Sequence, residues 1–72
     1  MKTVYLDEIK SLKETEVLTL LKSKGVCMYG DIIKKLGISQ TEGQQIIFSL
    51  LSRGLIRYQY RSSYLELNIE LK

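Results

Sequence analysis

The sequence predicts an α+β domain in which three short helices precede a C-terminal β-hairpin. Apolar residues recur at helical spacing in three segments before Arg53, and the pattern then changes to alternation in twos. Gly25, Gly37 and Gly54 each follow one of the helical segments, a position where glycine commonly ends a helix. A chain of 72 residues has room for one modest core, so we expect residues 1–72 to form a single domain.

The first helix is expected from about Leu12 to Ser23. It follows a capping box, Ser11-Leu12-Lys13-Glu14, in which the serine hydroxyl and the glutamate carboxylate each accept a hydrogen bond from the other residue's backbone N–H. Its apolar side is formed by Val17, Leu18, Leu20 and Leu21. After Gly25, the apolar segment Val26–Met28 is long enough only for a small strand.

The second helix is expected over Gly30–Leu36 and the third over Ser39–Arg53, with Ser39 as the cap of the third. The turn Gly37-Ile38-Ser39 is too short for an antiparallel pair, and its glycine permits a sharp bend. The inward side of the third helix is formed by Gly43, Ile46, Ile47, Leu50 and Leu51. We therefore expect the third helix to cross the second and to present its first turns outward.

The period of two after Gly54 predicts a hairpin over residues 55–71. Its strands are expected at Leu55–Tyr60 and Tyr64–Leu71, joined by the polar turn Arg61-Ser62-Ser63. The second strand carries a long apolar face made of Leu65, Leu67, Ile69 and Leu71. This apolar face is larger than a hairpin on a three-helix core needs, so we expect either residues 1–10 or a second subunit to cover it.

Composition argues against catalysis and metal binding. The chain has no histidine and one cysteine, which removes the usual general base, the commonest metal ligand and any internal disulfide. Its acidic residues do not cluster, and Cys27 lies between apolar neighbours, where burial is expected. A domain of this size has no room for an enclosed substrate cavity. We expect no enzyme activity, no metal, no cofactor and no small-molecule ligand.

We expect a cytoplasmic protein without a membrane partner. No apolar run approaches the roughly 18–20 residues that span a bilayer. Asp7 and Glu8 come too early in the chain for a secretion signal. The net charge of +3 is compatible with nucleic acid, and equally with an ordinary polar surface. The abundance of Ile, Leu, Lys and Tyr suggests an archaeal or viral source, on composition alone.

Two short motifs carry a resemblance to a known family. Leu50-Leu51-Ser52-Arg53-Gly54-Leu55-Ile56 is similar to the passage from recognition helix into wing, and Leu36-Gly37-Ile38-Ser39 to the turn, of small winged helix-turn-helix proteins. Such proteins are common among archaeal, viral and bacterial transcription regulators. The resemblance covers about Leu12 to Ile69 and implies a three-helix core at 12–53 with a wing at 55–71. The family usually has valine or a similar residue in place of Gly43.

The resemblance implies a small transcription regulator that binds double-stranded DNA sequence-specifically. The third helix would enter the major groove, and the wing would contact the backbone or the minor groove. The expected base contacts are Gln40, Thr41, Gln44 and Gln45, since glutamine pairs with adenine and the threonine methyl touches thymine. The expected phosphate contacts are Tyr29, Lys34, Lys35, Arg57 and Arg61, with Ser62 as a further DNA contact at the tip of the wing. The alternative for the polar face of the third helix is simple solvation.

A protein-interaction module without DNA binding is the alternative function. The first three turns of the third helix hold no positive residue, although the family is often basic there. Glu42 in the first turn repels phosphates unless it accepts a hydrogen bond from cytosine, and its role toward the helix dipole explains it without any function. Phe48 is expected beneath Tyr58, or else against thymine methyls or a protein partner. A positive band from Lys34 through Arg57 to Arg61 would favour DNA. A neutral apolar face around Phe48 would favour a protein.

We also expect a homodimer that binds two half-sites spaced by about one helical turn of DNA. Three features indicate dimerisation: the apolar last strand, the unassigned residues 1–10, and the small contact area of a single winged unit. In this hypothesis residues 1–10 form an N-terminal extension available for subunit contact.

Overall fold

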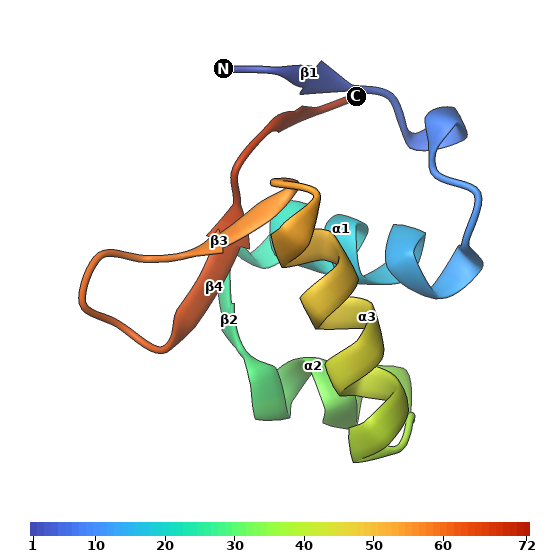
Figure 1. Ribbon diagram of the computed structural model, residues 1–72, viewed down its shortest axis with the longest axis vertical. Helices are drawn as coiled ribbons and strands as arrows, with labels where there is room; N and C mark the ends of the chain where they lie inside the picture. Colours follow the sequence, from blue (N-terminus) through green and yellow to red (C-terminus); the bar gives the residue numbers. More distant parts are fainter.

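The computed structural model describes residues 1–72 and has an α+β architecture with three α-helices, a three-stranded antiparallel sheet and a two-stranded parallel sheet (Figure 1). The elements in chain order are β1 (Thr3–Val4), the 3-10 helix η1 (Leu6–Glu8), α1 (Leu12–Lys24), β2 (Val26–Met28), α2 (Tyr29–Leu36), α3 (Gln40–Ser52), β3 (Ile56–Tyr58), β4 (Tyr64–Leu67) and β5 (Glu70–Leu71). The three predicted helices and the small strand β2 are confirmed, each helix end within one residue.

Serine caps and a glycine turn set the helix ends that matter for the site. The hydroxyls of Ser11 and Ser39 accept hydrogen bonds from the backbone N–H groups of Glu14 and Glu42, at 3.4 and 3.1 Å. Gly37 lies in the left-handed region with φ of 65°. Because glycine adopts this conformation without steric cost, the chain turns sharply between α2 and α3.

One apolar core joins the three helices to both sheets. α1 lies behind α3 in Figure 1 and packs against α2, α3, β2 and β4. The most deeply buried side chains are Val17, Leu18, Leu21, Ile32, Leu50, Ile56 and Leu65. The predicted inward sides of the helices are confirmed, except that five of their residues are only half-buried: Leu20, Ile33, Leu36, Ile46 and Leu51.

Gly43 lets α3 lie close against α2. A Cβ atom at this position would overlap Cδ1 of Ile33 and would lie 3.1 Å from the Tyr29 hydroxyl. That hydroxyl donates a hydrogen bond of 2.8 Å to the carbonyl of Gln40. Ile33 therefore fills the space that a side chain at position 43 would take, and the first turns of α3 are held on α2 by apolar contact and by a hydrogen bond.

β4 is the central strand of the antiparallel sheet, in the order β2-β4-β3. Leu65 of β4 is paired with Cys27 on one side and with Tyr58 on the other, and its side chain is fully buried. The β3–β4 hairpin extends away from the helices (Figure 1). The predicted hairpin is thus confirmed, with shorter strands than expected and with β2 as an additional partner.

The prediction of one continuous strand over Tyr64–Leu71 is wrong. The chain bends after Leu67, where Asn68 donates hydrogen bonds from its backbone N–H to the Leu55 carbonyl at 3.0 Å and from its side-chain amide to the Gly54 carbonyl at 3.1 Å. These bonds draw Asn68 toward the start of the hairpin. The chain consequently leaves the antiparallel sheet before β5 begins.

β5 pairs in parallel with β1, so the first and the last strand of the chain lie side by side (Figure 1). Val4, Ile69 and Leu71 are buried in the core, and Leu6 and Ile9 pack against it. The apolar last strand is therefore covered by residues 1–10 of the same chain. Of the two coverings expected from the sequence, the structure has the one that needs no second subunit.

Replacement of Gly43 by valine should lower the free energy of unfolding by about 1–3 kcal/mol, because the branched side chain overlaps Ile33 and crowds the Tyr29 hydroxyl. Gly30 is the matched control: it is a helical glycine in α2 with open space at its Cβ position. Gly30→Ala should leave stability unchanged or raise it by up to about 1 kcal/mol. Urea unfolding of both variants measures the difference. A Gly43→Val protein as stable as the parent would contradict the close α2–α3 contact.

Candidate functional site

A groove runs between α3 and strand β3 of the hairpin. We call it the α3–hairpin groove, and it is lined by Tyr29, Thr41, Gln44, Gln45, Ile47, Phe48, Leu51 and Tyr58. No charged side chain is among these residues. The groove brings together three of the four expected base contacts, from the leading turns of α3, with aromatic side chains from α3 and the hairpin.

The polar side of α3 is open to solvent. Gln40, Thr41, Gln44 and Gln45 are all exposed, and none of their side chains makes a hydrogen bond within the chain. The predicted outward presentation of the first turns of α3 is confirmed. Four polar side chains with unused donors and acceptors therefore stand exposed on the first turns of α3, and three of them line the groove.

Phe48 is the largest exposed apolar group in the groove. Its side chain is 73% exposed, and Tyr58 across the groove is 49% exposed. The preferred expectation, that Phe48 lies beneath Tyr58, is wrong, because a covered ring would not keep most of its surface in water. The face around Phe48 is neutral and apolar. Sequence reasoning placed Phe48 next to Tyr58 and assigned Leu51 to the core, but it did not predict an open groove lined by all three, because that groove depends on where the hairpin lies.

Lys34 and Lys35 lie on a different side of α2 from the groove. Together with Lys24 and Asp31 they line a depression above Cys27, between α2, the end of α1 and strand β2. Cys27 is buried as expected, and burial raises the pKa of its thiol, with Lys24 acting in the opposite direction. The two lysines therefore stand apart from the polar side of α3.

Arg57 is held by other side chains of the sheet. Its Nε donates to the Glu66 carboxylate at 2.8 Å and its Nη1 donates to the Asn68 side-chain oxygen at 3.1 Å, while Gln59 donates to the other Glu66 oxygen at 3.2 Å. The bonds from Arg57 and then Gln59 lower the pKa of Glu66. The guanidinium expected to contact phosphate is thus already paired with a carboxylate.

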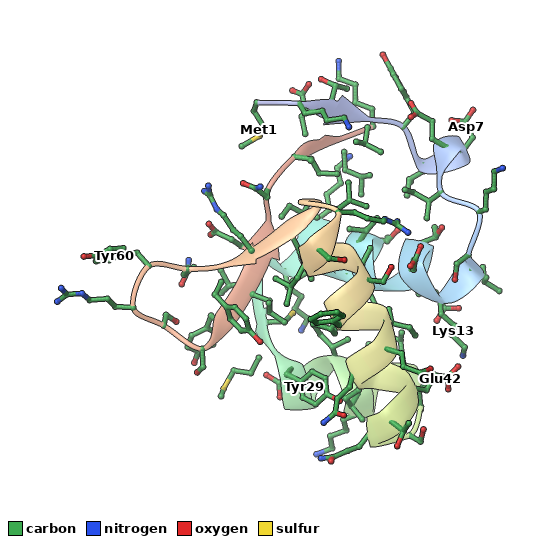
Figure 2. All side chains as sticks on the ribbon, in the orientation of Figure 1. Met1, Asp7, Lys13, Tyr29, Glu42 and Tyr60 are labelled. Atoms are coloured by element: carbon green, nitrogen blue, oxygen red, sulfur yellow. The ribbon has the colours of Figure 1, made fainter.

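Arg61 and Ser62 lie at the tip of the hairpin, where the neighbouring Tyr60 points away from the molecule (Figure 2). The Arg61 guanidinium lies 5.2 Å from the ring centre of Tyr60, and the Arg61 backbone has φ of 54°, which is uncommon outside glycine. Ser62 accepts a hydrogen bond from the Tyr64 N–H at 2.9 Å. Since Arg57 is paired and Lys34 lies beyond α2, the positive band from Lys34 through Arg57 to Arg61 does not form.

Tyr29 serves α3 instead of projecting into solvent. Its side chain is half-buried between α2 and α3, and its hydroxyl proton goes to the Gln40 carbonyl. Tyr29 also lines the α3–hairpin groove. Its observed contribution is therefore to position the leading turn of α3, and the expected phosphate contact of Tyr29 stays a prediction.

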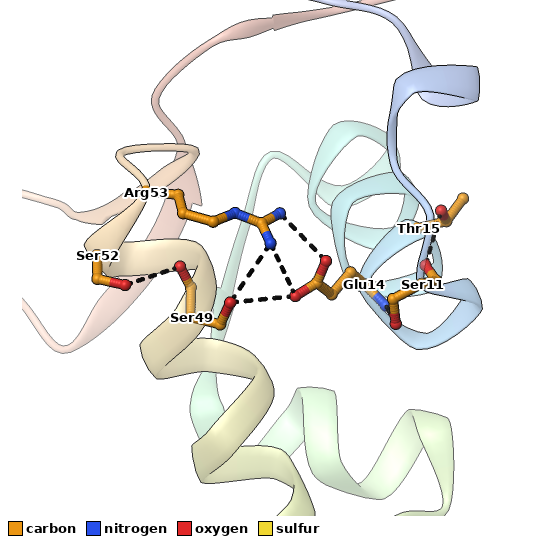
Figure 3. A network of polar contacts seen from close by, with 6 residues as sticks. All are labelled: Ser11, Glu14, Thr15, Ser49, Ser52 and Arg53. Carbon is orange, nitrogen blue, oxygen red and sulfur yellow. Dashed lines mark hydrogen bonds and ion pairs between the residues drawn. The ribbon is translucent and has the colours of Figure 1, made fainter.

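A polar network joins α1 to the end of α3 (Figure 3). The two Glu14 carboxylate oxygens accept hydrogen bonds from the Arg53 guanidinium at 3.1 and 3.3 Å, and one also accepts from the Ser49 hydroxyl at 3.2 Å. The expected capping box is thus only half present: Ser11 caps the helix, whereas Glu14 turns toward a charged donor. This pairing also occupies the arginine that ends α3.

None of the helices has the length and apolar character that crossing a bilayer requires. Comparison of the chain with protein-family models, with curated proteins and with solved structures gives no match. The candidate site is therefore assigned from its geometry and chemistry alone.

The lowered pKa of Glu66 should rise toward its usual value when Arg57 is replaced by glutamine, since the largest cause of the shift is then removed. Arg61→Gln is the control, because Arg61 contacts no carboxylate. Carboxyl chemical shifts followed by NMR measure both. Since the pKa of Glu66 is lowered in the folded state, the pair's contribution to stability is complete above the unfolded-state pKa and is lost as pH falls through the folded-state pKa. Equal Glu66 titrations in parent and Arg57→Gln would contradict this pairing.

Proposed function

We propose that this chain is a winged helix-turn-helix protein that binds double-stranded DNA sequence-specifically, as a small cytoplasmic transcription regulator and not as an enzyme. In this proposal α3 enters the major groove, and the β3–β4 hairpin is the wing on the backbone or the minor groove. The sharp turn at Gly37, the crossing of α3 over α2 and the hairpin that follows α3 support the assignment.

The observation that carries the proposal is the set of uncommitted polar side chains on the first turns of α3. Gln40, Thr41, Gln44 and Gln45 are exposed and lack partners within the chain. Base edges in the major groove are arrays of uncharged donors and acceptors, and glutamine side chains match adenine there with two hydrogen bonds. A neutral helix face is therefore suited to reading bases, provided that the positive charges lie around it.

The phosphate contacts are assigned to the margin of the site. Arg61 is the strongest candidate, because it stands at the hairpin tip without a carboxylate partner. Lys34 and Lys35 are exposed on α2 and contact the backbone at a greater distance from α3. Arg57 contributes less, since binding phosphate means giving up Glu66.

A protein-interaction module is the second candidate function. It is favoured by the neutral apolar face around Phe48 and by the interrupted positive band. Selection from a random duplex library, followed by sequencing of the retained DNA, separates the two functions. Enrichment of a common motif supports the DNA-binding proposal, whereas the absence of enrichment at low salt overturns it.

The homodimer remains part of the proposal, but fewer observations support it. Residues 1–10 and the last strand cover one another, so only the small contact area of a single unit still argues for two copies on DNA. Sedimentation at micromolar concentration with only a monomer present would exclude a dimer that forms before DNA binding.

Replacing Gln44 and Gln45 with alanine, singly and together, should lower the ratio of specific to random-duplex binding. Each lost bidentate pair with adenine removes about 1–3 kcal/mol of discrimination. Thr19→Ala on α1 is the control, since Thr19 is exposed and lies outside the groove. Fluorescence anisotropy with the selected duplex and with a scrambled one gives the ratio. Unchanged ratios in both glutamine variants would remove these residues from base readout.

Arg61→Ala should weaken binding to all duplexes alike and should reduce the slope of log affinity against log salt by about one, because one phosphate contact is lost. The control is Lys10→Ala, since Lys10 is exposed and lies outside the groove and the hairpin, and this variant should leave the slope unchanged. Titrations between low and moderate salt measure both slopes. An Arg61→Ala slope equal to that of the parent would exclude the phosphate contact.

A further inference from the structure

We propose that the α3–hairpin groove recognises thymine methyl groups, so that the duplex read by this chain is rich in A·T pairs where it meets Phe48. This inference rests on the proposed DNA binding and specifies the bases. It begins from the direction of the side chains on α3. Residues three, four and seven positions apart share one face of a helix, which places Thr41, Gln44, Gln45 and Phe48 in a single stripe.

The stripe combines amide groups with one large apolar group. Gln44 and Gln45 stand one turn before Phe48, and all three side chains are exposed in the groove. The Phe48 ring is 73% exposed, and Tyr58 faces it from the hairpin. Because the Phe48 ring is mostly exposed to water, its burial against an apolar group of a partner would contribute favourably to binding.

Among the four bases, only thymine presents an apolar group in the major groove. Thymine presents its C5 methyl beside the O4 acceptor, and the paired adenine presents one donor and one acceptor that suit glutamine. The stripe thus offers an amide for adenine and a ring for the methyl of its partner. Both surfaces are uncharged, so the match requires no ion to be stripped of water.

Guanine is a poor match for the same surface. Its two acceptors are read most often by arginine or lysine, and the groove contains neither. Arg53 is the only basic residue at the end of α3, and Glu14 and Ser49 hold its guanidinium on the side of α1. The expected specificity for A·T pairs therefore follows from the absence of arginine and lysine side chains in the groove as well as from Phe48.

The test removes the methyl groups without changing the hydrogen-bonding edges. The best duplex from the random library is compared with the same duplex in which each thymine is replaced by deoxyuracil. The parent protein should lose about three- to fivefold in affinity for each contacted methyl, the value of one buried methyl-sized group. Phe48→Ala should lose most of this preference, leaving only what the Thr41 methyl contributes.

Tyr60→Ala is the matched control. Tyr60 is an aromatic residue with 84% exposure at the hairpin tip, outside the groove, so its removal should leave the preference for thymine over uracil intact. Both substitutions are at exposed positions, and thermal unfolding confirms that the variants fold.

The outcomes separate the inference from the function on which it rests. A parent protein that binds the selected duplex but not more tightly than its uracil counterpart overturns the inference and leaves the DNA-binding proposal standing. A preference that is unchanged in Phe48→Ala also overturns it, because the methyls are then read elsewhere. Failure to enrich any duplex overturns both proposals and leaves the protein-interaction module as the remaining candidate function.

Discussion

The close contact between α2 and α3 determines where the candidate site lies. The absence of a side chain at Gly43 lets Ile33 pack beneath α3, and the Tyr29 hydroxyl then reaches the carbonyl of Gln40. Both contacts act on the first two turns of α3, which carry the exposed polar residues. The opposite end of α3 is held by the core through Leu50. The orientation of the helix is thus fixed at both ends before any ligand arrives, so binding need not order it.

The distribution of charge is the second constraint. Two arginines near the site are paired with carboxylates, Arg53 with Glu14 and Arg57 with Glu66, and both pairs link segments that are distant in the sequence or on separate strands. These pairs support the arrangement of α1, α3 and the hairpin. They also leave the groove side of α3 uncharged, although the chain as a whole is basic. Structural use of the arginines therefore shapes the chemistry of the groove.

Local signals predicted the helices well. Ser11, Ser39 and Gly37 act through neighbours within a few residues, so their effect can be read directly from the sequence. The break between β4 and β5 could not be predicted from the sequence, because the alternating pattern up to Leu71 is the same for one long strand and for two short ones. The two strands are separated by the hydrogen bonds of Asn68. The long-range pairs could not be predicted either. Glu14 lies 39 positions from Arg53, and no local pattern links them.

The parallel pairing of β1 with β5 determines how the molecule would respond to force. The chain enters at the start of β1 and leaves at the end of β5, at opposite ends of the pair (Figure 1). Tension applied to the two termini would slide the strands past one another along their length. The hydrogen bonds from Leu6 to Lys72, from Glu70 to Lys2 and from Lys72 to Val4 would then share the load and break together, unlike the successive rupture of a ladder that is unzipped from one end. Two very short strands would thus resist the separation of the termini by shear.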